Sequence, residues 1–284
     1  MNIRARGLAY LEHPFAVCNE ELAAELTRIG WAALAQNEGL AAQQYSIANC
    51  VDKRVLVTGH RQRLASPGTE EVWLEFPDFQ RLRPFYDEHG LVPMEAEALG
   101  PQLVLNKLES ALALLNRAGG VGASVRKLVK SIQVLQQPHP EIDTSYSHPN
   151  IPFSIFVSVC ADASAVSSLR VAESILHEAM HLQLTLLEHH VEMVRPASAA
   201  LYYSPWRDEE RPVRGVLHGM YVFRAVHDFY ADLLVKQNCL LEARDFIVHR
   251  LEGIRNEFGS LLCFPEIPDL TDSGKRLATN LIQY

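Results

Sequence analysis

The sequence lacks the features that mark secreted, disulfide-bonded or membrane-spanning chains. Only five of its 284 residues are cysteine, and no two of them have the CxxC spacing of a redox or zinc motif. An odd number of scattered thiols is typical of reduced cysteines, so we expect no disulfide framework. No segment approaches the roughly 18 consecutive apolar residues that span a bilayer, which predicts no transmembrane helix.

Basic residues are also few relative to acidic ones. The chain has 26 Lys and Arg against 34 Asp and Glu, which gives a formal net charge of −8. Because nucleic-acid binding needs clustered Lys and Arg against the phosphates, nucleic acid is not expected as the main partner. The N-terminal sequence MNIRARGLAYLEHPFAV lacks the apolar core of a signal peptide. We therefore expect a cytoplasmic protein with no membrane partner.

An ordinary apolar content and clear periodicity predict an α+β fold. Hydrophobic residues make up 48% of the chain and charged residues 21%, as in a typical folded domain. We expect a mostly helical molecule with a small β-sheet next to a metal-binding helix. Helical patterns cover residues 19–39, 102–118, 123–130, 216–235 and 240–258, and strand-like patterns cover residues 54–58, 72–76, 131–135 and 151–159.

The chain is expected to form one compact domain with two parts. Residues 1–140 are predicted to form a mainly helical N-terminal lobe, and residues 141–284 to form the catalytic region. Residues 77–101 contain four prolines and are expected to be an irregular connection. Residues 194–216 are expected to form a loop. The sequence contains no internal repeat and no low-complexity segment.

The most informative motif is an HExxH sequence inside the apolar segment Val171 to His190. The apolar residues of this segment recur at helical spacing, which predicts a buried amphipathic helix. His177 and His181 are four residues apart on one helix face, so both imidazoles could hold one metal ion at roughly 2.0–2.1 Å. Glu178 is rotated by about 100° and could reach a metal-bound water or ligand. Unpaired polar groups in such a helix cost roughly 1–3 kcal/mol each, which favours a metal site over a chance match.

The third ligand determines the class of an HExxH site. Leucines stand where the metzincin motif requires its glycine and third histidine, so that class is not supported. Glu188 shares the helix face but lies about 10 Å beyond His181, at roughly 1.5 Å per residue. We prefer His218, which opens the next long helix between Gly215 and Gly219, two residues that permit close backbone approach. The alternative for His218 is an ordinary core or capping histidine.

Three arginines lie between the motif and His218. Three neutral histidines would leave the double charge of the ion uncompensated, so an anionic co-ligand is expected to bind. Arg207, Arg211 and Arg214 could hold the rest of that anion, because a guanidinium binds a carboxylate through two hydrogen bonds. The alternative is that they pair on the surface with the acidic residues 208–210.

Three segments in this order resemble a known family. The strand IPFSIFVSV, the helix SILHEAMHLQL and the downstream YYSPWR and RPVRGVLHGMYVF are similar to the HExxH-motif family of iron(II)- and α-ketoglutarate-dependent peptide β-hydroxylases, which is found with peptide natural product (RiPP) biosynthesis. The resemblance covers roughly residues 145–235. It implies iron ligation by His177, His181 and His218, and binding of α-ketoglutarate by residues among Trp206, Arg207, Arg211 and Arg214, with Arg207 or Arg211 on the distal carboxylate.

The implied reaction is β-hydroxylation of a residue in a ribosomally made precursor peptide. The small-molecule co-substrates would be α-ketoglutarate and O₂, and the co-products succinate and CO₂. Glu178 would then orient a ligand or a water molecule, since no general base is required. The main alternative is a zinc metallopeptidase in which Glu178 is the general base. A third possibility is a non-catalytic module with a structural metal, which would have four protein ligands.

Overall fold

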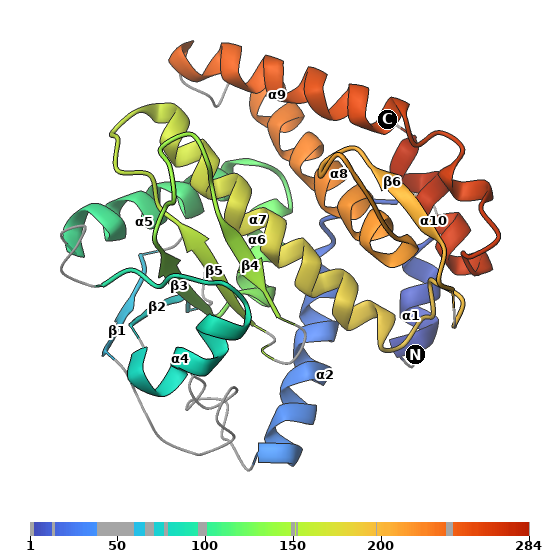
Figure 1. Ribbon diagram of the computed structural model, residues 1–284, viewed down its shortest axis with the longest axis horizontal. Helices are drawn as coiled ribbons and strands as arrows, with labels where there is room; N and C mark the ends of the chain where they lie inside the picture. The colour runs from blue at the N-terminus through green and yellow to red at the C-terminus, as the bar shows by residue number, and fades with distance from the viewer. Residues whose placement is uncertain are drawn as a thin grey trace.

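The computed structural model describes residues 3–12, 15–38, 60–65, 71–76, 79–95, 101–148, 151, 153–196, 198–236 and 241–283. The strand expected at 54–58 lies outside these residues. Within them the fold is the mostly helical α+β arrangement that the sequence predicts (Figure 1). In chain order the elements are α1 (Ile3–Tyr10), α2 (Glu20–Glu38), β1 (His60–Arg63), β2 (Trp73–Phe76), α4 (Phe79–Glu88), α5 (Pro101–Arg117), α6 (Val121–Leu128), β3 (Ser131–Leu135), β4 (Ser145–Ser147), β5 (Ser154–Ser158), α7 (Ala165–Glu188), β6 (Leu201–Ser204), β7 (Glu209–Pro212), α8 (Val213–Val235), α9 (Leu241–Gly259), η2 (Phe264–Glu266) and α10 (Asp272–Ile282).

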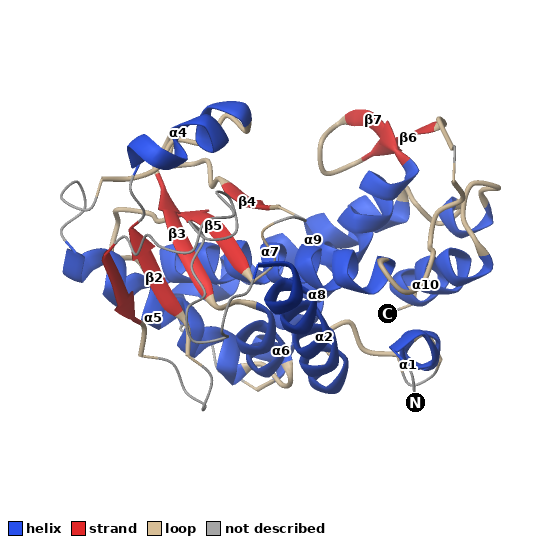
Figure 2. Cartoon of the chain, turned by 90° about the horizontal axis from the view of Figure 1, so that it is seen from below, coloured by secondary structure: helices blue, strands red, loops and turns tan. Residues whose placement is uncertain are grey.

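The main sheet has the strand order β1-β2-β3-β5-β4. Its three central strands are parallel, while β1 and β4 run antiparallel to their neighbours at the two edges. Every residue of β3 and β5 is buried, because helices cover one face of the sheet and α4 covers part of the other (Figure 2). The sequence of residues 131–135 alternates like that of a half-buried strand, but this expectation is wrong, since a central strand is covered on both faces.

Helix α7, which carries the HExxH motif, lies at the centre of the molecule. It passes between the sheet on one side and α8 and α9 on the other (Figure 1). Its first turn is capped by the Ser164 side chain, which accepts a hydrogen bond from the backbone N–H of Ser167 at 3.1 Å. Apolar contacts on nearly all sides fix the helix in place, so its polar residues are held rigidly.

The N-terminal helices pack onto the same core. The predicted start of α2 at Asn19 is confirmed, because its side chain accepts a hydrogen bond from the backbone N–H of Leu22 at 2.9 Å. Helix α2 then packs on α6 and α7. The expected division at residue 140 falls between β3 and β4, and both strands belong to one sheet.

Two segments differ from the prediction. Residues 79–88, expected to be irregular, form α4, in which Leu82, Phe85 and Tyr86 are buried at helical spacing and outweigh the cost of the internal Pro84. The expected loop 194–216 contains the antiparallel hairpin of β6 and β7, and α8 begins directly after it. Local patterns do not reveal this hairpin, because its strands are short, are largely exposed apart from the buried Ser204, and carry no apolar alternation.

The described cysteines are free thiols, as expected, but they differ in burial. Among the described cysteines, Cys18, Cys160 and Cys263 are free thiols; Cys160 is buried, Cys18 is partly buried and Cys263 is exposed. Cys50 and Cys239 lie outside the described residues.

Within the described part of the chain, no helix combines the length and apolar character needed to cross a membrane.

Candidate metal centre

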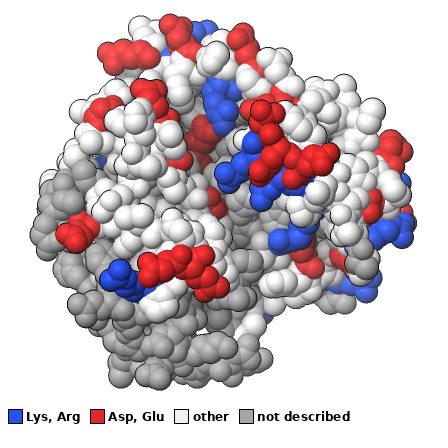
Figure 3. Space-filling model, in the orientation of Figure 1, with Lys and Arg blue, Asp and Glu red and all other residues white. Residues whose placement is uncertain are grey.

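A large cleft opens beside α7 and brings most of the predicted site residues together. Its volume is about 880 Å³, and its walls are the 141–148 segment with β4, the exposed face of α7, the β6–β7 turn and the first turns of α8. The space-filling view is hollowed at this position, and both basic and acidic side chains stand around the hollow (Figure 3). The cleft is large enough for a small co-substrate together with part of a peptide.

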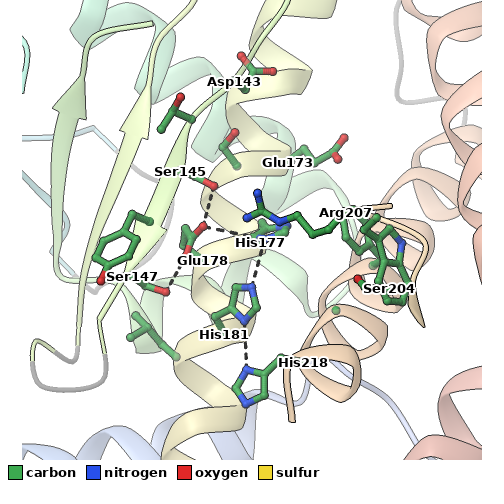
Figure 4. Close-up of a pocket in the computed structure, with 18 of the residues that line it drawn as sticks. Asp143, Ser145, Ser147, Glu173, His177, Glu178, His181, Ser204, Arg207 and His218 are labelled. Atoms are coloured by element: carbon green, nitrogen blue, oxygen red, sulfur yellow. Dashed lines mark hydrogen bonds and ion pairs between the residues drawn. The ribbon is translucent and has the colours of Figure 1, made fainter. Parts of the chain in front are cut away.

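His177 and His181 lie side by side on the face of α7 that lines the cleft (Figure 4). Their Nε2 atoms are 3.2 Å apart. Two ligands at roughly 2.1 Å from one ion have this separation when the angle between them is about 100°. Burial lowers the pKa of both imidazoles, and the neighbouring His177 and His218 lower that of His181 further. Both rings are therefore neutral near pH 7, with a lone pair available to a metal ion.

His218 also reaches this pair, but on the far side of His181. Its Nδ1 is 3.1 Å from Nδ1 of His181, and the two rings are stacked at 18°. The two nitrogens of one imidazole point in different directions, so an ion on Nε2 of His181 is not on the side that faces His218. In these positions His218 supports His181, and direct ligation by His218 requires one ring to turn. Ligation by His218 stays a prediction.

The second nitrogen of His218 is bound by Glu188. The Glu188 carboxylate accepts a hydrogen bond from Nε2 of His218 at 3.0 Å and one from Arg214 at 2.8 Å. Burial raises the pKa of Glu188, but the hydrogen bond from His218 and the charge of Arg214 outweigh it and bring the pKa below its usual value. A carboxylate on the outer nitrogen of a histidine fixes its tautomer, which is a common arrangement around metal ligands.

Glu178 is held from the opposite wall of the cleft by two serines of β4. The hydroxyl of Ser145 donates to one carboxylate oxygen at 2.6 Å, and that of Ser147 donates to the other at 2.6 Å. The carboxylate is 4.0 Å from Nε2 of His177, which is farther than the 3.2 Å between the Nε2 atoms of His177 and His181 (Figure 4). Glu178 therefore faces the site as a fixed anion beside the metal position.

The three arginines have different surroundings. Arg214 is bound to Glu188 at 2.7 Å, and Arg211 lies 3.7 Å from the exposed Glu209. Arg207 forms no ion pair with any described residue, and its guanidinium extends from the β6–β7 turn into the cleft toward His177 (Figure 4). Its charge contributes to the lowered pKa of His177. Arg207 is therefore the cation with the best position for the second carboxylate of a metal-bound anion.

Trp206 lines the cleft and also packs against α8. It stacks on Phe223 with the ring centres 4.9 Å apart and the planes at 11°. Its ring also lies directly on Gly219, where an added Cβ would be 2.6 Å from the indole. Gly219 thus permits the close approach that the sequence predicts, whereas Gly215 has only ordinary contact distances. This packing fixes the β6–β7 turn, and with it Arg207, against α8.

Several residues of the site are not evident from the sequence. Ser145 and Ser147 lie in a polar segment without a predicted element, although their alternation around Tyr146 is a strand signal with both hydroxyls on one face. Glu173 lies one turn before His177, but Arg250 and Tyr230 bind its carboxylate at 2.7 and 2.8 Å, so it is not available to a metal. These contacts link residues far apart in sequence, and no local pattern reveals them.

The donor set fits a metal ion in part. Across the described residues, no group of three or more His, Cys, Asp or Glu side chains converges on one point. The Nε2 atoms of His177 and His181 have the spacing of two metal ligands, and the third donor is not assembled around them.

No protein-family model matches this chain, and neither does any curated protein sequence. The assignment of a function therefore depends on the cleft itself.

Proposed function

We propose that this protein is an iron(II)- and α-ketoglutarate-dependent hydroxylase that acts on a peptide. The main support is that one cleft contains both the histidine pair and Arg207. The histidine pair offers a position for a metal ion, and Arg207 offers a cation that is separate from that position. α-Ketoglutarate carries two carboxylates, so one can bind the metal while the other binds a guanidinium. The substrate would be a ribosomally made precursor peptide in the cytoplasm.

His177 and His181 would hold iron(II) through Nε2, with His218 as the third ligand or as the support of His181. Bound iron would supply the redox chemistry of the reaction. In the overall balance, one atom of O₂ enters a C–H bond of the peptide to form a hydroxyl group. The other atom enters succinate, which forms together with CO₂ from α-ketoglutarate.

The remaining residues bind and orient the reactants. The Glu188–His218 contact fixes the ring of His181, and the packing of Trp206 holds Arg207 over the cleft. The β4 serines keep Glu178 in a single orientation, from which it can accept a hydrogen bond from a water or ligand at the metal. Orientation of this kind is what a preorganised site supplies, because the groups need no rearrangement during the reaction.

The zinc metallopeptidase is supported by one observation, the position of Glu178 next to the metal position. However, both oxygens of Glu178 already accept short hydrogen bonds from serine hydroxyls, so the carboxylate is engaged in holding its own orientation. A peptidase needs this carboxylate to accept a proton from a metal-bound water. A hydroxylase does not, so the serine contacts favour the hydroxylase.

The two functions are separated by loading the protein with iron(II) or with zinc and supplying a mixture of peptides. We expect a mass gain of one oxygen atom in the peptides with iron, α-ketoglutarate and O₂, and no cleavage with zinc. Glu178→Gln keeps the size of the side chain and removes its charge, so it is the matched variant. Zinc-dependent cleavage that disappears in Glu178→Gln would instead establish the peptidase.

A further inference from the structure

Strand β4 has a free edge that faces the cleft. It is the last strand of the main sheet, and its other edge pairs with β5 in the register Ser145 to Val157 and Ser147 to Ile155. All three residues of β4 line the cleft, next to His177 and Glu178. Within the described part of the chain, no strand or loop is hydrogen-bonded to the outer edge.

The register determines which backbone groups are directed outward. The backbone N–H of Ser158 donates to the carbonyl of Thr144 at 2.7 Å, and the N–H of Thr144 donates to the hydroxyl of Ser158 at 2.9 Å, so the backbone groups of these opposite residues face each other. Hydrogen-bonded pairs alternate in an antiparallel ladder, and the next one is Tyr146 with Phe156. The N–H and C=O groups of Ser145 and Ser147 consequently point away from β5, toward the cleft. They offer two donors and two acceptors at the spacing of an extended chain.

We propose that an extended peptide binds in this cleft as an additional strand on the edge of β4. This inference rests on the proposed function for the identity of the peptide as the substrate. Main-chain hydrogen bonds to Ser145 and Ser147 hold the peptide, a mode of binding that leaves the side-chain sequence largely free. The edge strand thereby gains a partner that satisfies its exposed backbone groups.

The same register predicts which residue is modified. Opposite residues in a sheet direct their side chains to the same face, and the hydroxyls of Ser145 and Ser147 point to Glu178 on α7. A peptide residue opposite either serine therefore directs its Cβ toward the histidine pair. The residue between them points to the other face, where Tyr146 lies 5.3 Å from the ring of His89.

The test measures binding and does not depend on turnover. Zinc-loaded protein, which cannot support the oxidation, is used to select linear decapeptides from a synthetic library, and the affinity of the best binder is measured. Each backbone nitrogen of that peptide is then methylated in turn. N-Methylation removes a donor and blocks approach, so we expect losses of about tenfold or more at alternate positions only. A uniform response along the peptide, or no retained decapeptide, overturns the proposal.

A matched pair of protein variants tests the strand itself. Ser147→Pro removes the outward N–H and leaves the ladder to β5 complete, while Ser147→Ala removes only the hydroxyl. We expect peptide affinity to fall in the proline variant well below that of the alanine variant, with zinc affinity equal in the two. Equal peptide affinities, or a dimer formed through this edge in solution, contradict the proposal. Because binding is measured with zinc, strand addition can be confirmed even if the oxidation is not found.

Discussion

The carboxylate of Glu188 accepts a hydrogen bond from Nε2 of His218 at 3.0 Å, and His218 in turn contacts His181 through Nδ1 at 3.1 Å. Glu188 follows His181 on the same helix but is too distant to share its ion, and α8 brings His218 between the two. A residue that sequence spacing excludes from the proposed metal position is thus connected to that position through a histidine from another helix.

Replacement of Glu188 by glutamine should weaken metal binding without unfolding the protein. The substitution keeps the size of the side chain but removes the charge that fixes the tautomer of His218. We expect a loss of metal affinity of about 10- to 100-fold, the usual effect of removing an outer carboxylate. Metal affinity is measured by competition with a chelator, with the exposed Glu192→Gln as the control. Equal affinities in both variants would show that the contact has no role at the metal.

The size of the effect in His218→Ala separates two roles for this histidine. If His218 supports His181, the loss of metal affinity should be similar to that in Glu188→Gln, because both variants break the same chain of contacts. If His218 is a direct ligand, the loss should be much larger, since a metal–nitrogen bond disappears. The geometry predicts the smaller loss, and the same chelator competition measures it.

Arg207 should determine the affinity for α-ketoglutarate. Removal of its charge in Arg207→Ala is expected to raise the KM for α-ketoglutarate by about 10- to 100-fold, as for a lost charge-assisted hydrogen bond. Arg211→Ala is the control, because Arg211 already lies beside Glu209 at the surface. Succinate formation at varied α-ketoglutarate concentrations gives both values. A larger effect in Arg211→Ala would transfer the role to Arg211.

The close contact between Trp206 and α8 predicts a stability difference between two glycines. In Gly219→Ala the new Cβ would lie 2.6 Å from the indole, so we expect destabilisation of about 1–3 kcal/mol. In Gly215→Ala the nearest atom is 3.6 Å away, and the substitution should be neutral or stabilising by up to about 1 kcal/mol. Urea unfolding of the two variants measures the difference. Equal stabilities would contradict the packing described here.

Metal binding should persist to lower pH than for ordinary histidines. Burial lowers the pKa of His177 and His181 below the usual 6.5. A lower pKa means that protons compete less with the metal, so affinity should remain nearly constant down to about pH 6.5 and decline only below it. Zinc affinity measured across this range provides the check. A decline that begins at higher pH would show that the imidazoles are solvated.

The sequence predicted the elements that have strong local patterns. The periodicity around HExxH identified α7, the alternation of residues 131–135 identified β3 as a strand, and the apolar run 151–159 identified β5. The histidine pair was predictable for the same reason, since a helix places residues i and i+4 on one face. The position of His218 and the hairpin carrying Arg207 depend on packing between α7 and α8, which local spacing does not encode.

The partners of Glu178 are hidden from the sequence for a related reason. Ser145 and Ser147 lie far before Glu178 in the chain, and only the register of β4 against β5 brings their hydroxyls onto its carboxylate. A polar three-residue strand has almost no sequence signal of its own. The fixed orientation of the Glu178 carboxylate is therefore visible in the structure and not in the sequence.

The central claim is tested most directly by succinate formation. The protein is reconstituted anaerobically with iron(II), supplied with α-ketoglutarate, exposed to air, and compared with His177→Ala treated in the same way. The proposed function predicts succinate that requires iron and O₂, formed slowly without a peptide and lost in the variant. Absence of iron-dependent succinate from the wild-type protein, with and without the peptide library, would contradict it.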